Sequence, residues 1–288
     1  MQTMIGVIGG SGVYQIDGLE GATWLPVKTP WGKPSDEVLV GRLDGVPMAF
    51  LPRHGRGHVH SPSSVPYRAN IAALKSLGCT DLVAVSAVGS LRADYAPGDF
   101  VIVDQFIDRT FAREKSFFGP GCVAHVSVAH PTCPRLGAAA AEAARAAGVK
   151  VHEGAVYLAM EGPQFSTLAE SRLYRSWGAD VIGMTGMPEA KLAREAELCY
   201  ASVAMVTDYD CWHRAKTPVT VDMIVGHLQA NITLAHAILV RLPDVLARRR
   251  FDCTCGHALD NAILTAPAAI PAALRRILAP ILGARGAA

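Results

Sequence analysis

Apolar runs of strand length alternate with amphipathic helical patterns along most of the chain. Runs rich in apolar and β-branched residues occur at residues 5–8, 47–52, 81–86, 100–104, 156–160, 180–185 and 199–207. Such runs are typical of strands that are buried on both faces of a sheet. Apolar residues at helical spacing occur at residues 66–78, 134–148, 167–178 and 220–249. The alternation predicts an α/β fold with a central mixed β-sheet flanked by helices.

Two of the predicted helices carry further local signals. Thr167 and Glu170 have the spacing of a capping box, which marks a helix start. The apolar side chains of that helix are expected on its buried side, namely Leu168, Leu173, Tyr174 and Trp177. The pattern at residues 220–249 predicts one long amphipathic helix, in which Pro243 can introduce a break.

The chain shows no internal repeat and no linker that would separate two domains of similar size. We therefore expect one domain from residue 1 to about residue 250. Residues 251–288 change in composition to Ala, Pro and Arg. They are expected to form a helical extension that packs on the same domain and ends in a loose tail.

Composition and charge exclude several classes of protein. Half of the 288 residues are hydrophobic, so most of the chain is expected to be ordered. The net charge of +2, from 27 basic and 25 acidic residues, gives no electrostatic footprint for a nucleic acid. The N-terminus lacks the pattern of a signal peptide, and no apolar run is long enough to span a bilayer. These observations favour a cytoplasmic protein without nucleic-acid or membrane partners.

The cysteines do not form the framework of a secreted protein. There are seven, and most lie singly in apolar runs, where free cysteine behaves as a small hydrophobic residue. Cys253 and Cys255 form the one close pair. In a reducing cytoplasm we expect this pair to be reduced. Only His257 lies near it in sequence, so the sequence does not favour a zinc site, and no metal is expected.

The segment from Thr207 to Trp212 carries the first candidate chemistry. Asp208 and Asp210 directly follow a buried apolar run, and residues i and i+2 of an extended segment point to the same side. Two carboxyl groups in one poorly solvated pocket do not both ionise easily, so one is expected to keep a proton. The alternative is a simple turn, in which Asp is common.

Two other strand ends carry candidate anion ligands. A Gly-rich turn at residues 9–12 contains Ser11, and glycines there allow backbone N–H groups to approach an anion. It does not fit the dinucleotide-binding pattern, because Gln15 occupies the third glycine position. Arg53 and His54 follow the apolar run 47–52, and arginine suits a small anion. A solvated basic loop is the alternative interpretation of this second segment.

In open α/β sheets, ligands bind outside the carboxyl ends of the strands. The strand-end candidates are therefore expected to share one pocket, and they are Ser11, Arg53, His54, Ser86, Ala87, residues 161–165, Met184, Thr185, Asp208 and Asp210. This set combines hydroxyl and basic groups for an anion with an aromatic ring and a carboxyl pair.

The order of these motifs resembles the methylthioadenosine phosphorylases of the trimeric purine nucleoside phosphorylase family. The resemblance runs from the first strand to about residue 245. It rests on Gly-Val-Ile-Gly-Gly-Ser-Gly at 6–12, Thr-Pro-Trp-Gly-Lys-Pro-Ser at 29–35, Arg-His-Gly at 53–55, Asp-Gln-Phe-Ile-Asp-Arg-Thr at 104–110, Glu-Gly-Pro-Gln-Phe at 161–165, Met-Thr at 184–185 and Thr-Asp-Tyr-Asp-Cys-Trp at 207–212. It implies a single-domain nucleoside phosphorylase fold, assembled as a trimer or a dimer of trimers.

The resemblance assigns a role to each candidate. The implied phosphate ligands are Ser11, Arg53, His54, Ser86, Ala87 and Thr185. Phe165 would stack on a purine and Met184 would lie against the ribose, although Met184 has core packing as an alternative. Ser86 stands where threonine is common in the family, and both residues offer a hydroxyl. Some thermostable relatives form disulfides from cysteines near the Cys253 and Cys255 positions.

The base and the 5′ end of the substrate follow from the same resemblance. Asp208 and Asp210 would face N7 and the amino group of a 6-aminopurine, whereas related enzymes for 6-oxopurines carry Asn nearby. Val221, Ile224 and Val225 would form an apolar wall for a 5′-methylthio group. His125 matches the position that reaches into the neighbouring subunit, with an ordinary loop histidine as the alternative.

The implied reaction is phosphorolysis of S-methyl-5′-thioadenosine to adenine and 5-methylthioribose 1-phosphate, a step of purine and methionine salvage. Phosphate is a co-substrate, and no cofactor is expected. Adenosine would be a slower substrate, because an apolar pocket rejects a hydroxyl only modestly. The alternatives are a phosphorylase of the same fold for 6-oxopurines such as methylthioinosine, and a non-enzymatic adenosine-binding module.

Overall fold

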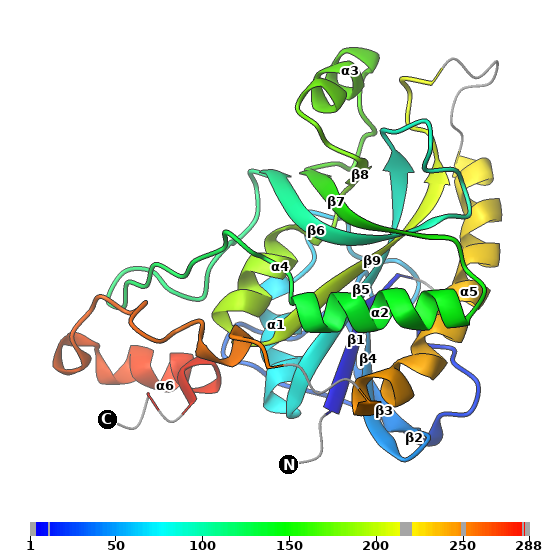
Figure 1. Cartoon of the computed structure of the whole chain (residues 1–288). Helices are drawn as coiled ribbons and strands as arrows, with labels where there is room; N and C mark the ends of the chain where they lie inside the picture. Colours follow the sequence, from blue (N-terminus) through cyan, green and yellow to red (C-terminus); the bar gives the residue numbers. More distant parts are fainter. Residues whose placement is uncertain (1–3, 11, 214–220, 249–251, 284, 286–288) are drawn as a thin grey trace.

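One mixed sheet of nine strands forms the centre of the molecule (Figure 1). The computed structural model describes residues 4–10, 12–213, 221–248, 252–283 and 285. The strands are β1 (Met4–Gly9), β2 (Glu20–Leu25), β3 (Val38–Leu43), β4 (Val46–Pro52), β5 (Cys79–Ser90), β6 (Phe100–Arg109), β7 (Val151–Met160), β8 (Val181–Gly183) and β9 (Cys199–Asp208). Their order across the sheet is β2-β3-β4-β1-β5-β8-β7-β6-β9.

The sheet closes on itself at one side. Besides its place at the end of this order, β9 pairs in parallel with β5 over almost its whole length. The strands β5, β8, β7, β6 and β9 therefore form a closed ring of hydrogen-bonded neighbours. The pairs β5–β8 and β6–β9 are antiparallel, whereas β7–β8 and β6–β7 are parallel. The expected central mixed sheet is confirmed, and its partial closure is a feature that the sequence pattern did not indicate.

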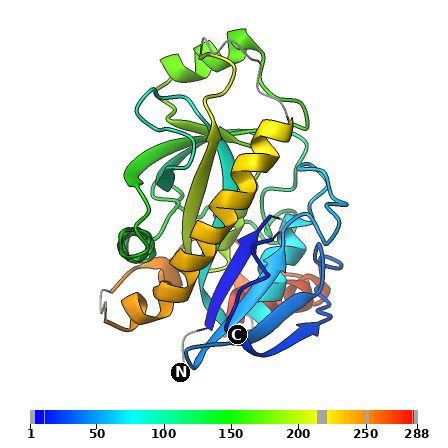
Figure 2. The ribbon, with the colours of Figure 1, turned by 90° about the vertical axis from the view of Figure 1, so that its right-hand side faces the viewer.

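Helices cover both faces of the sheet (Figures 1 and 2). They are α1 (Tyr67–Ser76), α2 (Pro134–Ala146), α3 (Leu168–Ser176), α4 (Gly186–Glu195), α5 (Val221–Arg248) and α6 (Ala272–Leu282). Apolar side chains of α1, α4 and α6 belong to one core cluster, and those of α2 and α5 belong to another. Neighbouring strand residues alternate between these clusters, as Leu82 and Val83 do, because successive side chains of a strand point to opposite faces.

The local helix predictions have mixed outcomes. The capping box at Thr167 and Glu170 is confirmed, with both reciprocal hydrogen bonds present. Tyr174 is buried, but Leu168, Leu173 and Trp177 are 43%, 46% and 44% exposed, so their predicted burial is wrong for the single chain. The physical reason is that α3 projects beyond one end of the closed ring of strands and does not lie along the sheet (Figure 1).

Helix α5 continues through Pro243 without a break. It also fixes the glycine turn after β1. Gly12 has a φ of +93°, and a Cβ atom there would lie 2.8 Å from Ile232 of α5. His236 of α5 hydrogen bonds to the carbonyl oxygen of Gly12 at 3.0 Å. Glycine is therefore required at residue 12 both by the backbone conformation and by the approach of the helix.

Among the described residues after α5, those of α6 pack on the rest of the chain. Leu278, Ile281 and Leu282 of α6 are buried in the core cluster that also contains α1. Residues 123–125 form a short antiparallel contact with residues 262–265, which includes the bridge between Ala124 and Ile263. The division at residue 250 and the loose tail stay predictions. No helix within the described ranges is long and apolar enough to cross a membrane.

Candidate active site

The parallel strands bring the predicted site residues to one edge of the sheet. Strands β4, β1, β5 and β9 run in the same direction, so their carboxyl ends lie together. Arg53 and His54 follow β4, Ser86 and Ala87 lie in the second half of β5, and Asp208 ends β9. Ser11 follows β1 but lies outside the described residues. The strand directions therefore bring five of the expected contributors to the same edge of the sheet.

Arg53 is the largest of the fully buried side chains, with 2% of its surface exposed. Its guanidinium pairs with both carboxylate oxygens of Glu189, at 2.8 and 3.1 Å. It also donates to the carbonyl oxygens of Val85 at 3.0 Å and Ile8 at 3.2 Å. Arg53 thus joins β1, β4, β5 and α4 into one rigid unit, and the solvated basic loop is not what the structure shows for this residue.

Glu189 is a buried partner that the sequence analysis did not identify. It is 1% exposed, lies in the first turn of α4, and also accepts a hydrogen bond from the hydroxyl of Tyr200 at 3.0 Å. Burial alone would lower the pKa of Arg53, but the charge and hydrogen bonds of Glu189 raise it above its ordinary value. Arg53 is therefore always charged, and its charge is balanced before any substrate binds.

His54 differs electrostatically from its neighbour. Burial, followed by the charge of Arg53, lowers the pKa of His54 to about 4. The ring is therefore neutral near pH 7. Its Nδ1 lies 2.9 Å from the carbonyl oxygen of His60, which can only accept, so Nδ1 carries the proton and Nε2 is an acceptor. The expected second cation at the anion site is thus a neutral imidazole in the substrate-free protein.

Thr185 is the candidate anion ligand nearest the start of α4. Thr185 is buried directly before the helix, and its hydroxyl does not cap the helix. The backbone is non-helical at Met187, so the regular helix begins after that residue and Thr185 lies on the irregular segment before it. The Arg53–Glu189 pair connects this helix to the end of β4, and Arg53 contacts Val85, which precedes Ser86. The candidate anion ligands that the structure describes are therefore physically linked.

Asp208 and Asp210 lie together, although not by the extended geometry that the sequence suggested. The backbone turns after Asp208, and Asp210 has a φ of +50°. Its backbone N–H donates to Oδ1 of Asp208 at 2.7 Å, and the hydroxyl of Thr207 donates to Oδ2 of Asp208 at 2.8 Å. A Cβ atom on Gly89 would lie 3.0 Å from Asp208 and 3.4 Å from Asp210. A carboxyl oxygen of Asp208 and the Cβ atom of Asp210 therefore lie beside Gly89 near the end of β5.

The two carboxyl groups are not equivalent. Burial raises the pKa of Asp210, and the nearby Asp208 adds to this effect. The hydroxyl of Ser171, which donates to Asp210 at 2.5 Å, partly opposes the shift. The expectation that one carboxyl group of the pair keeps a proton therefore applies best to Asp210 in the substrate-free protein. Ser171 comes from α3, so this projecting helix contributes to the site.

The segment after β7 is held by a second buried ion pair. Arg113 pairs with Glu161 at 3.1 Å and donates to the carbonyl oxygens of Met184 and Met187, both at 2.6 Å. Burial alone would raise the pKa of Glu161, but hydrogen bonds from Ser63 and from the backbone of Phe111 and Ala112, with the charge of Arg113, bring it down to about 2. Arg113 thus fixes the loops that carry Phe165 and Met184, a role that the sequence analysis did not assign.

The remaining predicted contacts have different outcomes. Phe165 is 57% exposed, so its ring is accessible for stacking. Met184 packs against Gly162, where an added Cβ would lie 2.5 Å from its sulfur. Val221, Ile224 and Val225 fall in the first part of α5, but their side chains lie outside what the structure describes. His125 is exposed, and its backbone N–H bonds to the carbonyl oxygen of Ala262, so it lies against the C-terminal extension.

The fold and this site define a nucleoside phosphorylase-like protein, with anion ligands and a carboxyl pair along adjoining strand ends. Comparison with known families agrees with that class. Residues 4–242 match the family model described as the phosphorylase superfamily. The chain belongs to this superfamily.

Individual relatives extend along almost the whole chain. It is 71% identical over 270 residues to the S-methyl-5′-thioadenosine phosphorylase of Cereibacter sphaeroides, and the match covers 93% of both chains. A solved methylthioadenosine phosphorylase from an Antarctic soil metagenomic library superposes with a TM-score of 0.93 at 45% identity, covering 98% of this chain and 100% of the other. A Schistosoma mansoni methylthioadenosine phosphorylase solved with adenine gives a TM-score of 0.83 at 38% identity, over 89% and 96% of the two chains.

Proposed function

We propose that this chain catalyses the phosphorolysis of S-methyl-5′-thioadenosine, releasing adenine and 5-methylthioribose 1-phosphate. The observation that carries the proposal is the arrangement along β5. Ser86 and Ala87 lie beside the buried Arg53 contact, and Gly89 lies beside Asp208 and Asp210. Ala87 and Gly89 are two residues apart, which is about 7 Å along a strand. This separation suits a ribose held between a phosphate and a purine.

The residues divide the reaction between them. A phosphate oxygen attacks C1′ of the ribose as the bond from C1′ to the purine nitrogen breaks, and the bond electrons remain on the purine. The phosphate is held below the developing positive charge by Ser86, Ala87, Arg53, His54 and Thr185. The neutral Nε2 of His54 suits the protonated oxygen of hydrogen phosphate. Phosphate is the co-substrate, and the mechanism needs no further cofactor.

The carboxyl pair receives the purine. A protonated carboxyl group donates to N7 as electrons collect on the leaving base, and an ionised one accepts from the 6-amino group. The raised pKa of Asp210 favours the proton on that residue before the substrate binds. For Asp208 to donate to N7, as the sequence suggested, the proton passes within the pair. A 6-oxopurine has hydrogen-bond acceptors at both N7 and O6. Because Asp208 and Asp210 share one proton, the pair can donate to only one of these acceptors, which disfavours 6-oxopurines.

The surrounding residues select the rest of the substrate. Phe165 stacks on the base, Met184 contacts the ribose, and Val221, Ile224 and Val225 face the methylthio group. We place the protein in the cytoplasm as a homotrimer, with His125 of one subunit completing the 5′ pocket of the next. The exposed apolar residues of α3 support self-association, because such a surface is unusual on a monomer. Light scattering coupled to size exclusion tests the trimer.

The decisive experiment is a phosphate-dependent assay with three nucleosides in parallel. We expect adenine release from methylthioadenosine, slower release from adenosine, and little reaction with methylthioinosine. Replacement of phosphate by sulfate is expected to abolish release. Binding of methylthioadenosine without turnover would favour a non-enzymatic adenosine-binding module, and preference for methylthioinosine would favour the 6-oxopurine alternative.

A further inference from the structure

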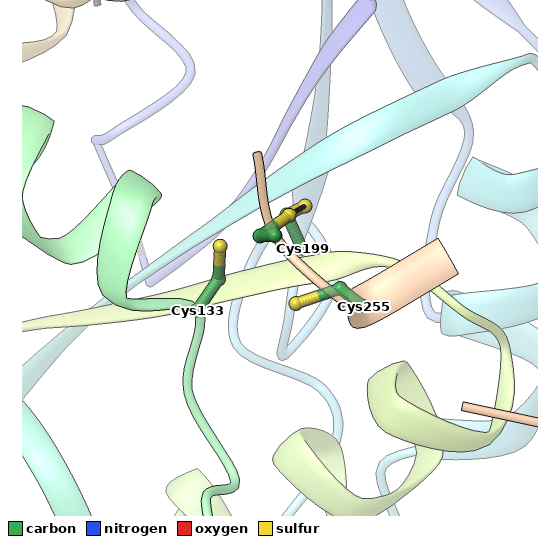
Figure 3. Close-up of side chains that lie close together, drawn as sticks. Cys133, Cys199 and Cys255 are labelled. Atoms are coloured by element: carbon green, nitrogen blue, oxygen red, sulfur yellow. Dashed lines mark hydrogen bonds between the residues drawn. The ribbon is translucent and has the colours of Figure 1, made fainter. Parts of the chain in front are cut away.

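Four cysteines that are far apart in sequence meet at the opposite end of β9 from the carboxyl pair. Cys133 directly precedes α2, Cys199 begins β9, and Cys253 and Cys255 lie in the segment after α5. Their sulfur atoms all lie within 4.8 Å of one another. Figure 3 shows Cys133, Cys199 and Cys255 entering this cluster from three separate elements. Because β9 has ten residues, the cluster is about 30 Å from Asp208.

The sulfur positions fit coordination better than disulfide formation. All four residues are free thiols, and the sulfurs of Cys199 and Cys253 are 3.3 Å apart. A disulfide bond is about 2.05 Å long. Four thiolates bound to zinc at about 2.3 Å in a tetrahedron would have sulfurs about 3.8 Å apart. The observed cluster therefore needs only small movements to surround one ion.

The surroundings supply the charges that such a site needs. Zinc with four thiolates has a net charge of −2, and the side chains of Arg135 and Arg194 lie beside the cluster. Nη1 of Arg194 donates to Sγ of Cys255 at 3.3 Å, and Arg135, which also pairs with Asp81, interacts with Cys199 and Cys253. The start of α2, directly after Cys133, adds a helix N-terminus that favours a thiolate. Hydrogen bonds to ligating sulfurs and nearby cations are the usual support of thiolate sites.

We propose that Cys133, Cys199, Cys253 and Cys255 bind one zinc ion in a closed, structural thiolate site. Binding converts four thiols to thiolates and releases four protons to solvent, with no change of oxidation state. The ion fastens the segment after α5 to the starts of α2 and β9. This differs from the expectation of no metal, because sequence spacing showed Cys253 and Cys255 but not that Cys133 and Cys199 would join them.

The first test measures metal in the intact wild-type protein, without a polyhistidine tag and under reducing conditions. Protein from zinc-supplemented medium is expected to contain one zinc per chain by mass spectrometry of the elements. After removal of zinc with a chelator, cobalt(II) is expected to give the visible absorption bands of a tetrahedral thiolate site. Absence of zinc, together with no cobalt spectrum for the reduced protein, would overturn the proposal.

Variants locate the site and control for folding. Cys253→Ser and Cys255→Ser are expected to lose the bound zinc or to bind it at least tenfold more weakly. Cys122→Ser removes another buried cysteine, outside the cluster, and is expected to keep one zinc per chain. Equal zinc content in all three variants would contradict the assignment.

A thiol titration separates the proposal from its redox alternative. The chain has seven cysteines, and the denatured, chelated wild type is expected to show all seven as free thiols. A titre of three free thiols, in protein purified without reductant and without exposure to air, would show two disulfides and overturn the zinc site.

Discussion

The anion end and the base end of the site are built in opposite ways. At the anion end, Arg53 and Glu189 form a fully buried pair whose hydrogen bonds tie three strands to α4. At the base end, Asp208 ends β9 and Asp210 lies on the turn after it, with Ser171 from the projecting α3 and an exposed Phe165. The first arrangement is rigid before the substrate binds. The second has the exposed groups that a bound base would cover.

Chemistry and stability therefore depend on different ends of the site. A change to the buried pair should affect the whole fold, because it leaves a charge without a partner in the core. A change to the carboxyl pair should affect turnover with little effect on stability, because these groups lie at a partly exposed loop.

The largest expected effect is on turnover, at the base end. Asp208→Asn and Asp210→Asn should each lower kcat for methylthioadenosine by about 10²- to 10⁴-fold, since each variant disrupts the shared proton. The thermal midpoint should change little. Steady-state kinetics and thermal unfolding measure both effects, with the exposed Asp17→Asn as the control. Wild-type kinetics in both variants would remove the pair from the mechanism.

Breaking the buried Arg53–Glu189 pair at the anion end should lower the stability of the fold. Glu189→Gln should lower the free energy of unfolding by about 3–5 kcal/mol, because Arg53 keeps a buried charge without its partner. Glu195→Gln is a matched control on the same helix, since Glu195 is buried but accepts from the neutral donors Ser116 and Phe117. It should lose only about 1 kcal/mol. Denaturant unfolding compares the two, and equal losses would show that the Arg53 charge is not the cause.

A fall in pH should also lower the stability of the fold, through protonation of His54 at the anion end. His54 has a pKa near 6.5 when unfolded and about 4 when folded, so between these values the unfolded chain binds more protons. Stability from this group is complete above about pH 6.5 and is lost as the pH falls toward 4, by up to about 3 kcal/mol. Across this range, the free energy of unfolding should depend less steeply on pH in His54→Gln than in the wild type. An unchanged slope would indicate that the ring is not buried in its neutral form.

The smallest expected effect concerns Phe165. Phe165→Ala should raise the KM for the nucleoside about tenfold, because stacking of an aromatic ring on a base contributes roughly 1–3 kcal/mol. Stability should change by less than about 0.5 kcal/mol, since the side chain is exposed. Phe111→Ala, also an exposed phenylalanine, is the control and should leave KM unchanged. A similar KM for Phe165→Ala and the wild type would exclude stacking at this residue.

Strand ends were the part of the site that the sequence could predict. Buried strands give a clear pattern, and the residues after each one, such as Arg53 and Asp208, lie where parallel strands converge. Glu189 could not be assigned in this way, because it is 136 residues from Arg53 and pairs with it only in the folded chain. Its position in the first turn of a helix after Thr185 was the available signal.

Contacts set by tertiary structure were the part that escaped prediction. The closing pair β5–β9 depends on strand order, which periodicity does not contain. The left-handed backbone of Asp210 replaced the extended geometry expected after Asp208, since Asp tolerates this conformation in turns. The exposed side of α3 was predicted to be buried because amphipathic spacing shows that a face is apolar, not what covers it.

The closed ring of strands also limits how copies of this chain can join. One end of the strand order returns to β5 through β9, so among the described strands β2 is left as the open edge. That strand is short and mostly exposed, and it begins with the charged residue Glu20. Short, charged edges discourage the addition of further strands. Assembly is therefore expected to use helices and loops, and a continuous intermolecular sheet would have to begin at β2.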